Sequence, residues 1–492
     1  MAREYVVAID IGTQSTRAAL VDPDGQIRDI ASSPIDLSAP RPGWAEQDPE
    51  QWWQTTVDNI AAVLERNRGV HVAAVGVGAQ MHSLVAVDTS GAALTARSAL
   101  WSDKRCLDQV QALLGRPDAE ELCQLAGNLP VPAWCGFKMA WLRAHRPAAY
   151  HRAATLLVAK DFVNLRLCGT LATDPTEASG SFLCDAASGQ WSEPLLAALG
   201  VDRAKLPPIT DPATVIGAIR AEVAKRTGLA AGTPVVAGSG DMLCQLLGAG
   251  ITRPGQVAVV AGTASIVAVA APEATTDGRL MNLRSASGGW MHFGISDAAG
   301  KAFRWFADEL CPAMTDFGDL TEAAADVPAG SAGLLFFPYL LGERTLGSAQ
   351  SRASFVGATL QHDRAHFIRA VLEGITLEDS RALRVLCPDG VSEPIRCIGG
   401  GAGSDRWNQI RADVFGHSVQ TLAQPEGGIQ GAAILAGVGA GWYASAAAGA
   451  EQVARPARTW TPSPGPAEVY AEAYRTFCAV HDALAPLWAR WP

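Results

Sequence analysis

Asp241 occupies a position from which a carboxylate could take part in group transfer. It follows an apolar run, 234–237, and the segment Gly238-Ser239-Gly240, so we expect it where a buried strand ends. A carboxylate there can accept the proton of a substrate hydroxyl as that oxygen attacks a phosphoryl group. Phosphoryl transfer requires little beyond positioning, charge neutralisation and such a base. An ordinary helix N-cap is the competing interpretation of the same aspartate.

A small polar loop near the N-terminus has the composition of a phosphate-binding loop. It runs Asp10-Ile11-Gly12-Thr13-Gln14-Ser15 between two strand-like segments, 6–9 and 18–21. Glycine lets backbone N–H groups approach an anion closely. An aspartate at a strand end can hold hydrated Mg²⁺ beside phosphate oxygens. Taken alone, the loop also fits a glycine-containing hairpin turn.

The same pattern returns in the second half of the chain. Residues 257–265 align with residues 7–15 at an offset of 250, so that Gly262 falls on Gly12 and Thr263 on Thr13. Because the offset is about half the chain, the repeat predicts two related lobes whose phosphate-type loops face a shared cleft.

The two loops differ at their first polar position, and this difference assigns them separate roles. Val260 stands where the first loop has Asp10, so only the first loop can supply a carboxylate to a metal ion. We expect the lobes to comprise residues 1–247 and 248–492.

A third glycine cluster, 399–403, follows a short apolar segment and precedes Ser404, a suitable helix N-cap. A glycine-rich turn at a helix N-terminus suits a nucleotide, because small residues permit close approach and N–H groups point outward. A plain glycine turn is the alternative. Competing signatures are missing from the sequence: it has no G-x-x-x-x-G-K-[ST] loop, no G-x-G-x-x-G before a helix and no G-x-S-x-G elbow.

The composition narrows the class of partner. The 492-residue chain has 39 Lys and Arg against 49 Asp and Glu, a formal net charge of −10, which argues against nucleic acid or an anionic membrane. Its 10 cysteines include no C-x-x-C pair, so we expect free thiols in a cytoplasmic protein. No signal peptide is visible. The uncharged stretch 427–450 is rich in glycine and predicts a closely packed helix rather than a membrane span.

Together, the three glycine loops resemble those of the actin, hexokinase and sugar-kinase ATPase superfamily. The resemblance implies an α/β fold of two ribonuclease-H-like lobes around a central cleft that holds ATP. Over nearly its whole length the chain is similar to the FGGY carbohydrate kinases, and among them most to the xylulokinases. Beyond the glycine loops, the segments that carry this likeness are 46–53, 80–82, 101–105, 240–241, 337–345, 354–357 and 366–373.

The resemblance assigns roles to individual residues. It implies that Asp241 is the catalytic base and also a sugar contact, and that Asp10 holds Mg²⁺. The implied sugar-binding residues are Gln80, Met81, His82, Trp101, Asp103 and Met242, although a lone His at a strand end is often structural and a Trp is usually core. The implied ATP contacts are Gly12, Thr13, Gly262, Thr263, Gly300, Gly400, Gly401 and Ala402.

Several residues depart from the family pattern, among them Ala133, Cys135 and Ala144 around a partly kept family signature. Met242 stands where xylulokinases commonly carry Asn, and Leu346 stands where the family usually continues with Pro. Methionine lacks the two donors and the acceptor of an amide. These departures concern the substrate more than the reaction, because the loops expected to bind ATP are intact.

We therefore predict ATP- and Mg²⁺-dependent phosphorylation of a ketopentose, D-xylulose to D-xylulose 5-phosphate. Another FGGY kinase acting on gluconate, another pentulose or a signalling sugar is the alternative within the family. The alternative from a different class is a nucleotide-switched interaction protein of the actin or chaperone type. The expected partners are a small-molecule sugar and ATP, with no nucleic acid and no membrane, and a homodimer stays open.

Overall fold

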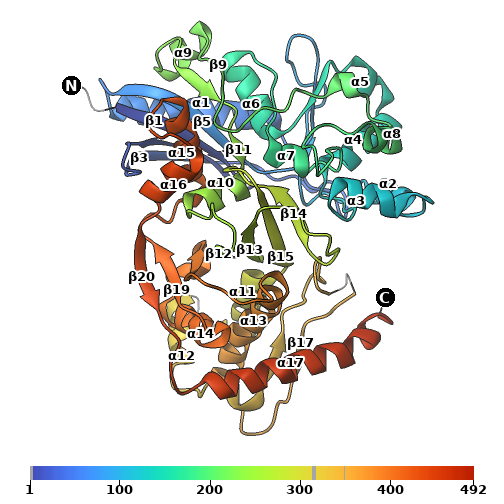
Figure 1. Ribbon diagram of the computed structural model, residues 1–492, viewed down its shortest axis with the longest axis vertical. Helices are drawn as coiled ribbons and strands as arrows, with labels where there is room; N and C mark the ends of the chain where they lie inside the picture. The colour runs from blue at the N-terminus through green and yellow to red at the C-terminus, as the bar shows by residue number, and fades with distance from the viewer. Residues whose placement is uncertain (1–3, 313–316, 348–349, 492) are drawn as a thin grey trace.

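The computed structural model describes residues 4–312, 317–347 and 350–491. It has two lobes, each built on a seven-stranded mixed sheet with helices packed against it. In Figure 1 the first lobe lies at the top and the second lobe at the bottom. This is the two-lobed α/β architecture of the actin and hexokinase type that the glycine loops predicted.

The sheet of the first lobe begins with antiparallel strands, continues with parallel strands and ends with an antiparallel strand at its edge. In spatial order its strands are β3(Ile27–Pro34), β2(Ser15–Val21), β1(Glu4–Ile11), β5(His71–Ala79), β10(Pro234–Val236) and β9(Val215–Ala218), and β11(Ser239–Gly240) also pairs with β5. β1 is antiparallel to β2 and parallel to β5. Strand β1 is buried from its second residue to its end, as expected for an apolar run at the centre of a covered sheet.

The second lobe repeats this arrangement. In spatial order its strands are β14(Met281–Arg284), β15(Trp290–Ser296), β13(Ser265–Ala271), β12(Val257–Ala261), β18(Ile395–Ile398), β19(Val419–Leu422) and β20(Pro456–Trp460). β12 is antiparallel to β13 and parallel to β18, just as β1 pairs with β2 and β5. The second strands begin at Ser15 and Ser265, so the offset of 250 residues is confirmed in space.

Helices cover the faces of both sheets. Those of the first half are α1(Pro49–Arg66), α2(Leu107–Leu114), α3(Ala119–Ala126), α4(Cys135–His145), α5(Pro147–Arg152), α6(Ala159–Cys168), α7(Pro175–Ser179), α8(Glu193–Leu199), α9(Ala221–Thr227) and α10(Asp241–Gly248). Those of the second half are α11(Ala299–Leu310), α12(Phe317–Ala323), α13(Arg364–Leu386), α14(Asp405–Phe415), α15(Gly427–Gly439), α16(Ala446–Val453) and α17(Ala467–Trp488). The short strands outside the sheets are β4(Glu46–Gln47), β6(Val85–Val87), β7(Ser98–Ala99), β8(Thr155–Leu157), β16(Leu335–Phe337) and β17(Ser354–Val356).

The glycine-rich stretch 427–450, predicted as one closely packed helix, forms the buried helix α15 and, after a turn, the start of α16. A Cβ atom on Gly431 would lie 2.0 Å from the Cys244 carbonyl oxygen, and one on Gly76 would lie 2.3 Å from the Ala432 carbonyl oxygen. Glycine is therefore required at both positions for α15 to approach α10 and β5. No helix in the described part of the chain is long and apolar enough to cross a membrane.

Helix α15 also returns the second half of the chain to the first lobe. It packs against β1, β5 and α10, and in Figure 1 it lies in the upper lobe. The second lobe thus contributes a helix to the sheet that carries the first phosphate loop. The division of the chain at residues 247 and 248 stays a prediction.

Helix α1 begins with a local side-chain cap but has no capping box. Asp48 is the N-cap and accepts a hydrogen bond from the backbone N–H of Glu50, and Pro49 is the first helical residue. The side chain of Gln51 does not reach back to the cap, because it exchanges two hydrogen bonds with Asp36 instead. A contact with a segment distant in sequence therefore replaces the local one.

Candidate active site

The first phosphate loop is a tight connection between β1 and β2. The Gly12 N–H donates to the Ser15 carbonyl at 2.9 Å, which closes the turn. Asp10 lies near the end of β1 and is 5% exposed. This placement matches the loop predicted from sequence and puts the only carboxylate of the loop at its base.

Asp10 has a cationic partner that sequence reasoning missed. Arg17 lies opposite Asp10 in the β1–β2 ladder, and its guanidinium forms ion pairs with Asp10 and with Glu426. Burial raises the pKa of Asp10, and it outweighs the opposing effect of Arg17. The available signal was a lone arginine directly before the apolar run 18–21, because an isolated charge in a buried strand needs a partner.

The sugar loop predicted at residues 80–82 begins where β5 ends, beside the phosphate loop. The Gln80 N–H donates to the Ile11 carbonyl at 2.7 Å. The Gln80 side chain donates to Gln47 at 2.6 Å, and Gln47 donates to the Thr13 carbonyl at 2.7 Å. The structure therefore ties the two predicted loops together through Gln47, a residue of the short strand β4.

His82 is held in an uncommon backbone conformation. Its φ is 64°, in the left-handed region that a residue with a side chain rarely adopts. Its ring meets Trp134 edge to face, with ring centroids 5.0 Å apart. Burial lowers the pKa of His82 well below its usual value, and the cations Lys138 and Arg344 act in the same direction. The imidazole is therefore neutral at neutral pH and can both donate and accept hydrogen bonds.

Asp241 is the first residue of α10, directly after β11. Strand β11 runs parallel to β5, with Gly240 paired to Ala79, so Asp241 and the sugar loop emerge from neighbouring strand ends. Burial raises the pKa of Asp241 to about 7, and the nearby charge of Asp10 contributes to the shift. A carboxyl with this pKa is well suited to exchange a proton near neutral pH.

Two predicted sugar-binding residues flank Asp241 in different ways. A Cβ on Gly240 would lie 2.5 Å from Cγ of Met81, so the Met81 side chain packs directly on the backbone before Asp241. The backbone N–H of Met242 donates to Asp241 Oδ1 at 2.7 Å, and the Met242 side chain packs partly against the hydrophobic core. Position 242 thus offers no side-chain amide to the base.

Trp101 lies at the first phosphate loop and is half exposed. Its indole N–H donates to the Thr13 hydroxyl at 3.2 Å, and the residue is 38% exposed. It therefore borders the phosphate loop and is not a core residue.

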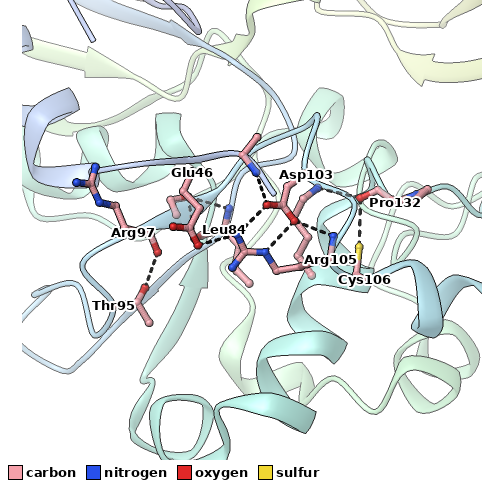
Figure 2. Close-up of polar contacts among 11 residues, drawn as sticks. Glu46, Leu84, Thr95, Arg97, Asp103, Arg105, Cys106 and Pro132 are labelled. Atoms are coloured by element: carbon pink, nitrogen blue, oxygen red, sulfur yellow. Dashed lines mark hydrogen bonds and ion pairs between the residues drawn. The ribbon is translucent and has the colours of Figure 1, made fainter. Parts of the chain in front are cut away.

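The structure places Asp103 behind the site. Asp103 has no exposed surface, and both of its carboxylate oxygens accept hydrogen bonds from Arg105, one of them also from the Ala45 N–H at 2.7 Å. Figure 2 shows this pair together with Glu46, which binds the same guanidinium at 2.7 Å. These hydrogen bonds support the segment that carries Trp101, and the contact of Asp103 with the sugar stays a prediction.

The predicted nucleotide residues of the second lobe converge. A Cβ on Gly300 would lie 2.1 Å from the Gly262 carbonyl oxygen, and the Lys301 N–H donates to the Thr263 carbonyl at 3.0 Å. The start of α11 therefore rests directly on the second phosphate loop, which requires glycine at position 300.

The third glycine cluster approaches the same loop from the end of β18. A Cβ on Gly401 would lie 2.9 Å from the Ala261 Cβ, whereas one on Gly400 would meet no described atom within 4 Å. Asn408 donates to the Ala402 carbonyl at 2.8 Å and Arg411 to the Gly401 carbonyl at 3.0 Å. Gly400 thus faces open space, while the carbonyl groups of Gly401 and Ala402 are fixed by hydrogen bonds from α14.

A buried carboxyl behind the second phosphate loop was also missed by sequence reasoning. Burial raises the pKa of Asp379 to about 7, although Ser265 and Arg411 oppose the shift. Asp379 is one of several buried polar residues in α13, so its sequence context gave no distinctive signal.

The departure at Leu346 has a physical explanation. Leu346 has a φ of 57°, which proline cannot adopt because its ring holds φ near −65°. The Leu346 carbonyl accepts a hydrogen bond from Arg381 at 2.9 Å. The backbone of this segment therefore differs locally from one that carries proline.

The donor set around Asp10 suits a hydrated magnesium ion. In the described residues no group of three or more His, Cys, Asp or Glu side chains is arranged to hold a metal ion. Mg²⁺ is usually bound in proteins through one or two carboxylates, waters and substrate phosphates. Asp10, whose charge contributes to the raised pKa of Asp241, could supply such a carboxylate.

Comparisons with known proteins agree with this geometry. Residues 5–248 match the N-terminal domain of the FGGY family of carbohydrate kinases, and residues 257–440 match its C-terminal domain. The chain is 30% identical to a xylulose kinase of Bacillus subtilis over 475 residues, which cover 93% of each protein.

Two solved structures superpose over almost the whole chain. One is a xylulose kinase from Rhodospirillum rubrum, with a TM-score of 0.92, 34% identity and coverage of 99% of this chain and 100% of that one. The other is a gluconate kinase from Lactobacillus acidophilus, with a TM-score of 0.94, 26% identity and full coverage of both chains. The chain therefore belongs to the FGGY family of carbohydrate kinases.

Proposed function

We propose that this carbohydrate kinase transfers the terminal phosphoryl group of ATP to a ketopentose, D-xylulose, and forms D-xylulose 5-phosphate. The observation that carries the proposal is the placement of Asp241. It follows β11 beside the sugar loop at the end of β5, and its pKa is raised to about 7.

In this proposal Asp241 accepts the proton of the attacking sugar hydroxyl at its carboxylate. Neutral His82 hydrogen-bonds sugar hydroxyls, Met81 packs against the carbon skeleton, and Gln80 joins this loop to the phosphate loop through Gln47. The backbone of Gly12 and Thr13 in one lobe and of Gly262 and Thr263 in the other binds the phosphates. Gly300, Gly400, Gly401 and Ala402 form the wall for the rest of the nucleotide.

Asp10 is the residue that would hold Mg²⁺, and the ion would neutralise charge on the phosphates. Arg17 provides a further positive charge at the same loop. Exclusion of water between the lobes protects ATP from hydrolysis. The ten cysteines are all free thiols, which supports the proposal that the enzyme works in the reducing cytoplasm.

Gluconate is the second candidate substrate, and two observations favour retaining it. A gluconate kinase is among the solved structures that superpose on the whole chain, and Met242 leaves no side-chain amide beside Asp241. An acid sugar would also require a cation near its carboxylate. The charges of Lys138 and Arg344 both lower the pKa of His82, so two cations lie near the sugar loop.

A panel of acceptors tests the proposal directly. ADP release is measured with D-xylulose, D-ribulose, gluconate and glycerol at saturating ATP and Mg²⁺, and the product of the best acceptor is identified by mass spectrometry and phosphorus NMR. We expect D-xylulose to give the highest kcat/KM. Preference for gluconate would replace the proposed substrate, and ADP release that no sugar stimulates would favour a nucleotide-switched protein.

The Asp241→Asn variant provides the matched control for the base. Asparagine has nearly the same shape but cannot accept a proton, so we expect kcat to fall by about 10²–10⁴-fold, with ATP still bound. Turnover close to that of the wild type would remove Asp241 from this role.

A further inference from the structure

The five-residue helix α7 contacts the surroundings of the base, the sugar loop and the second lobe. Thr176 faces Gly240 of β11, the Glu177 carboxylate accepts from the His82 N–H at 3.4 Å, and the Ser179 hydroxyl accepts from the Arg284 N–H at 2.9 Å. Figure 1 shows α7 to the left of α4 and above β14, in the lower part of the first lobe. Its side chains thus reach elements that lie far apart in the sequence.

The donor and acceptor in each hydrogen bond of the Thr176 hydroxyl follow from its chemistry. A threonine hydroxyl has one hydrogen to donate. That hydrogen goes to Asp174, whose Oδ2 lies 2.6 Å from the hydroxyl and also accepts from the Thr176 N–H at 2.8 Å. The Thr176 oxygen must therefore accept from its other two neighbours, the Gly240 N–H at 3.0 Å and the Ser239 hydroxyl at 3.0 Å.

A buried ion pair holds Asp174 in place. Lys160 Nζ lies 3.3 Å from Asp174 Oδ1 and 2.6 Å from Asp161 Oδ1, and all three side chains are almost fully buried. The same Lys160 ammonium donates to the Ala237 carbonyl at 3.0 Å. It therefore fixes both the partner of Thr176 and the chain that leads into β11.

Strand β11 is consequently held from several sides. Its two residues pair with Gly78 and Ala79 of β5. Met81 packs on Gly240, and the Thr176 hydroxyl accepts a hydrogen bond from the Gly240 N–H. Because Gly240 is covalently joined to Asp241, any displacement of Gly240 moves the carboxylate. Misplacement by about 1 Å can cost on the order of 10²-fold in rate.

We propose that Thr176 is a positioning residue for Asp241, and that it acts through the Gly240 backbone with Asp174 and Lys160 as its supports. Thr176 itself touches neither substrate nor the reacting atoms. The inference rests on the proposed function, because it concerns the geometry of the proposed base.

Thr176→Val tests the inference, since valine keeps the shape but removes the acceptor. We expect kcat with the preferred sugar to fall about 10- to 100-fold, while the KM for ATP stays within about twofold. Thr176→Ser restores the acceptor and should recover at least about a third of the wild-type kcat. Titration with a non-hydrolysable ATP analogue gives the fraction of binding-competent chains, and kcat is expressed per competent chain so that partial unfolding does not imitate the effect.

Thr56→Val is the matched control. Thr56 is a fully buried threonine of α1 whose hydroxyl has no hydrogen-bond partner in the described structure, so its variant should keep wild-type kcat. If Thr176→Val does not fold, Thr176→Ala replaces it, because a water molecule can then satisfy the Gly240 N–H. The expected loss of kcat is then smaller, about 3- to 30-fold.

The outcomes separate the inference from the proposed function. An unchanged kcat in folded Thr176→Val or Thr176→Ala, or a Thr176→Ser variant as impaired as Thr176→Val, overturns the inference while the wild-type and Asp241→Asn kinetics still uphold the proposed function. Wild-type protein that no sugar stimulates overturns both, because no reaction then remains for Thr176 to serve.

Discussion

Arg17 lies opposite Asp10 across the first hairpin, and its guanidinium joins Asp10 to Glu426, a residue 409 positions later in the sequence. This contact links the first phosphate loop to the start of α15. It also places a positive charge where the proposed mechanism brings the phosphates of ATP.

Arg17→Ala should weaken the interaction with ATP. Hydrogen bonds to a charged group contribute about 1.5–3 kcal/mol, so we expect the KM for ATP to rise about 10- to 100-fold, measured by coupled ADP release. Arg66→Ala is the control, because Arg66 pairs with Asp29 at the surface and its loss should leave the KM unchanged. An unaltered KM for ATP in Arg17→Ala would show that Arg17 has a structural role and does not contribute to ATP binding.

The reaction should depend on the ionisation of Asp241. Burial and the charge of Asp10 raise its pKa to about 7, and only the ionised carboxylate can act as a base. The value of kcat/KM for the sugar should therefore rise with pH from 6 to 8, with half its maximum near 7.

Asp10→Asn provides a second measurement of this effect. It removes the charge that contributes to the raised pKa, so its residual activity should reach half its maximum at a lower pH than that of the wild type. A pH profile that is flat from 5.5 to 8.5 in the wild type would exclude Asp241 as the titrating base.

Gly300→Ala should damage the nucleotide site specifically. The added Cβ would lie 2.1 Å from the Gly262 carbonyl oxygen, so the second phosphate loop must move. We expect the KM for ATP to rise at least about 10-fold, in line with the rate lost when reacting groups are misplaced by about 1 Å.

The control for this variant is Gly465→Ala, where an added Cβ would meet no described atom within 4 Å. Its kinetic constants should match the wild type. Equal values of the KM for ATP in Gly300→Ala and Gly465→Ala would mean that the second loop is not a phosphate site.

Asp103→Ala should reduce stability more than sugar binding. Its removal leaves the buried Arg105 guanidinium with Glu46 as the remaining carboxylate, and breaking a buried ion pair typically costs about 3–5 kcal/mol. We expect urea unfolding to show a loss of this order, with the KM for the sugar nearly unchanged.

Asp118→Ala is the matched control, because Asp118 forms a similar but exposed pair with Arg116. Its free energy of unfolding should change by less than about 1 kcal/mol. A raised KM for the sugar in Asp103→Ala without loss of stability would show that Asp103 contributes to sugar binding.

Local features were predictable from the sequence because their causes are local. Apolar runs interrupted by Gly-Thr indicated the hairpins that begin at Glu4 and Val257, and their common offset indicated the repeated lobe. Ser404 caps its helix as expected, because a side chain bonds to an N–H two or three residues away.

Tertiary structure alone decided which of these features meet. The residues around Arg17 do not predict its contact with Glu426, and those around Thr176 do not predict its contact with Gly240. Each contact depends on how separate elements pack. The family resemblance suggested Asp103 for the sugar pocket, and only the structure shows that Asp103 is buried and paired with Arg105. The chemistry of single loops is thus readable from residue type and spacing, while the arrangement of partners around them is set by long-range packing.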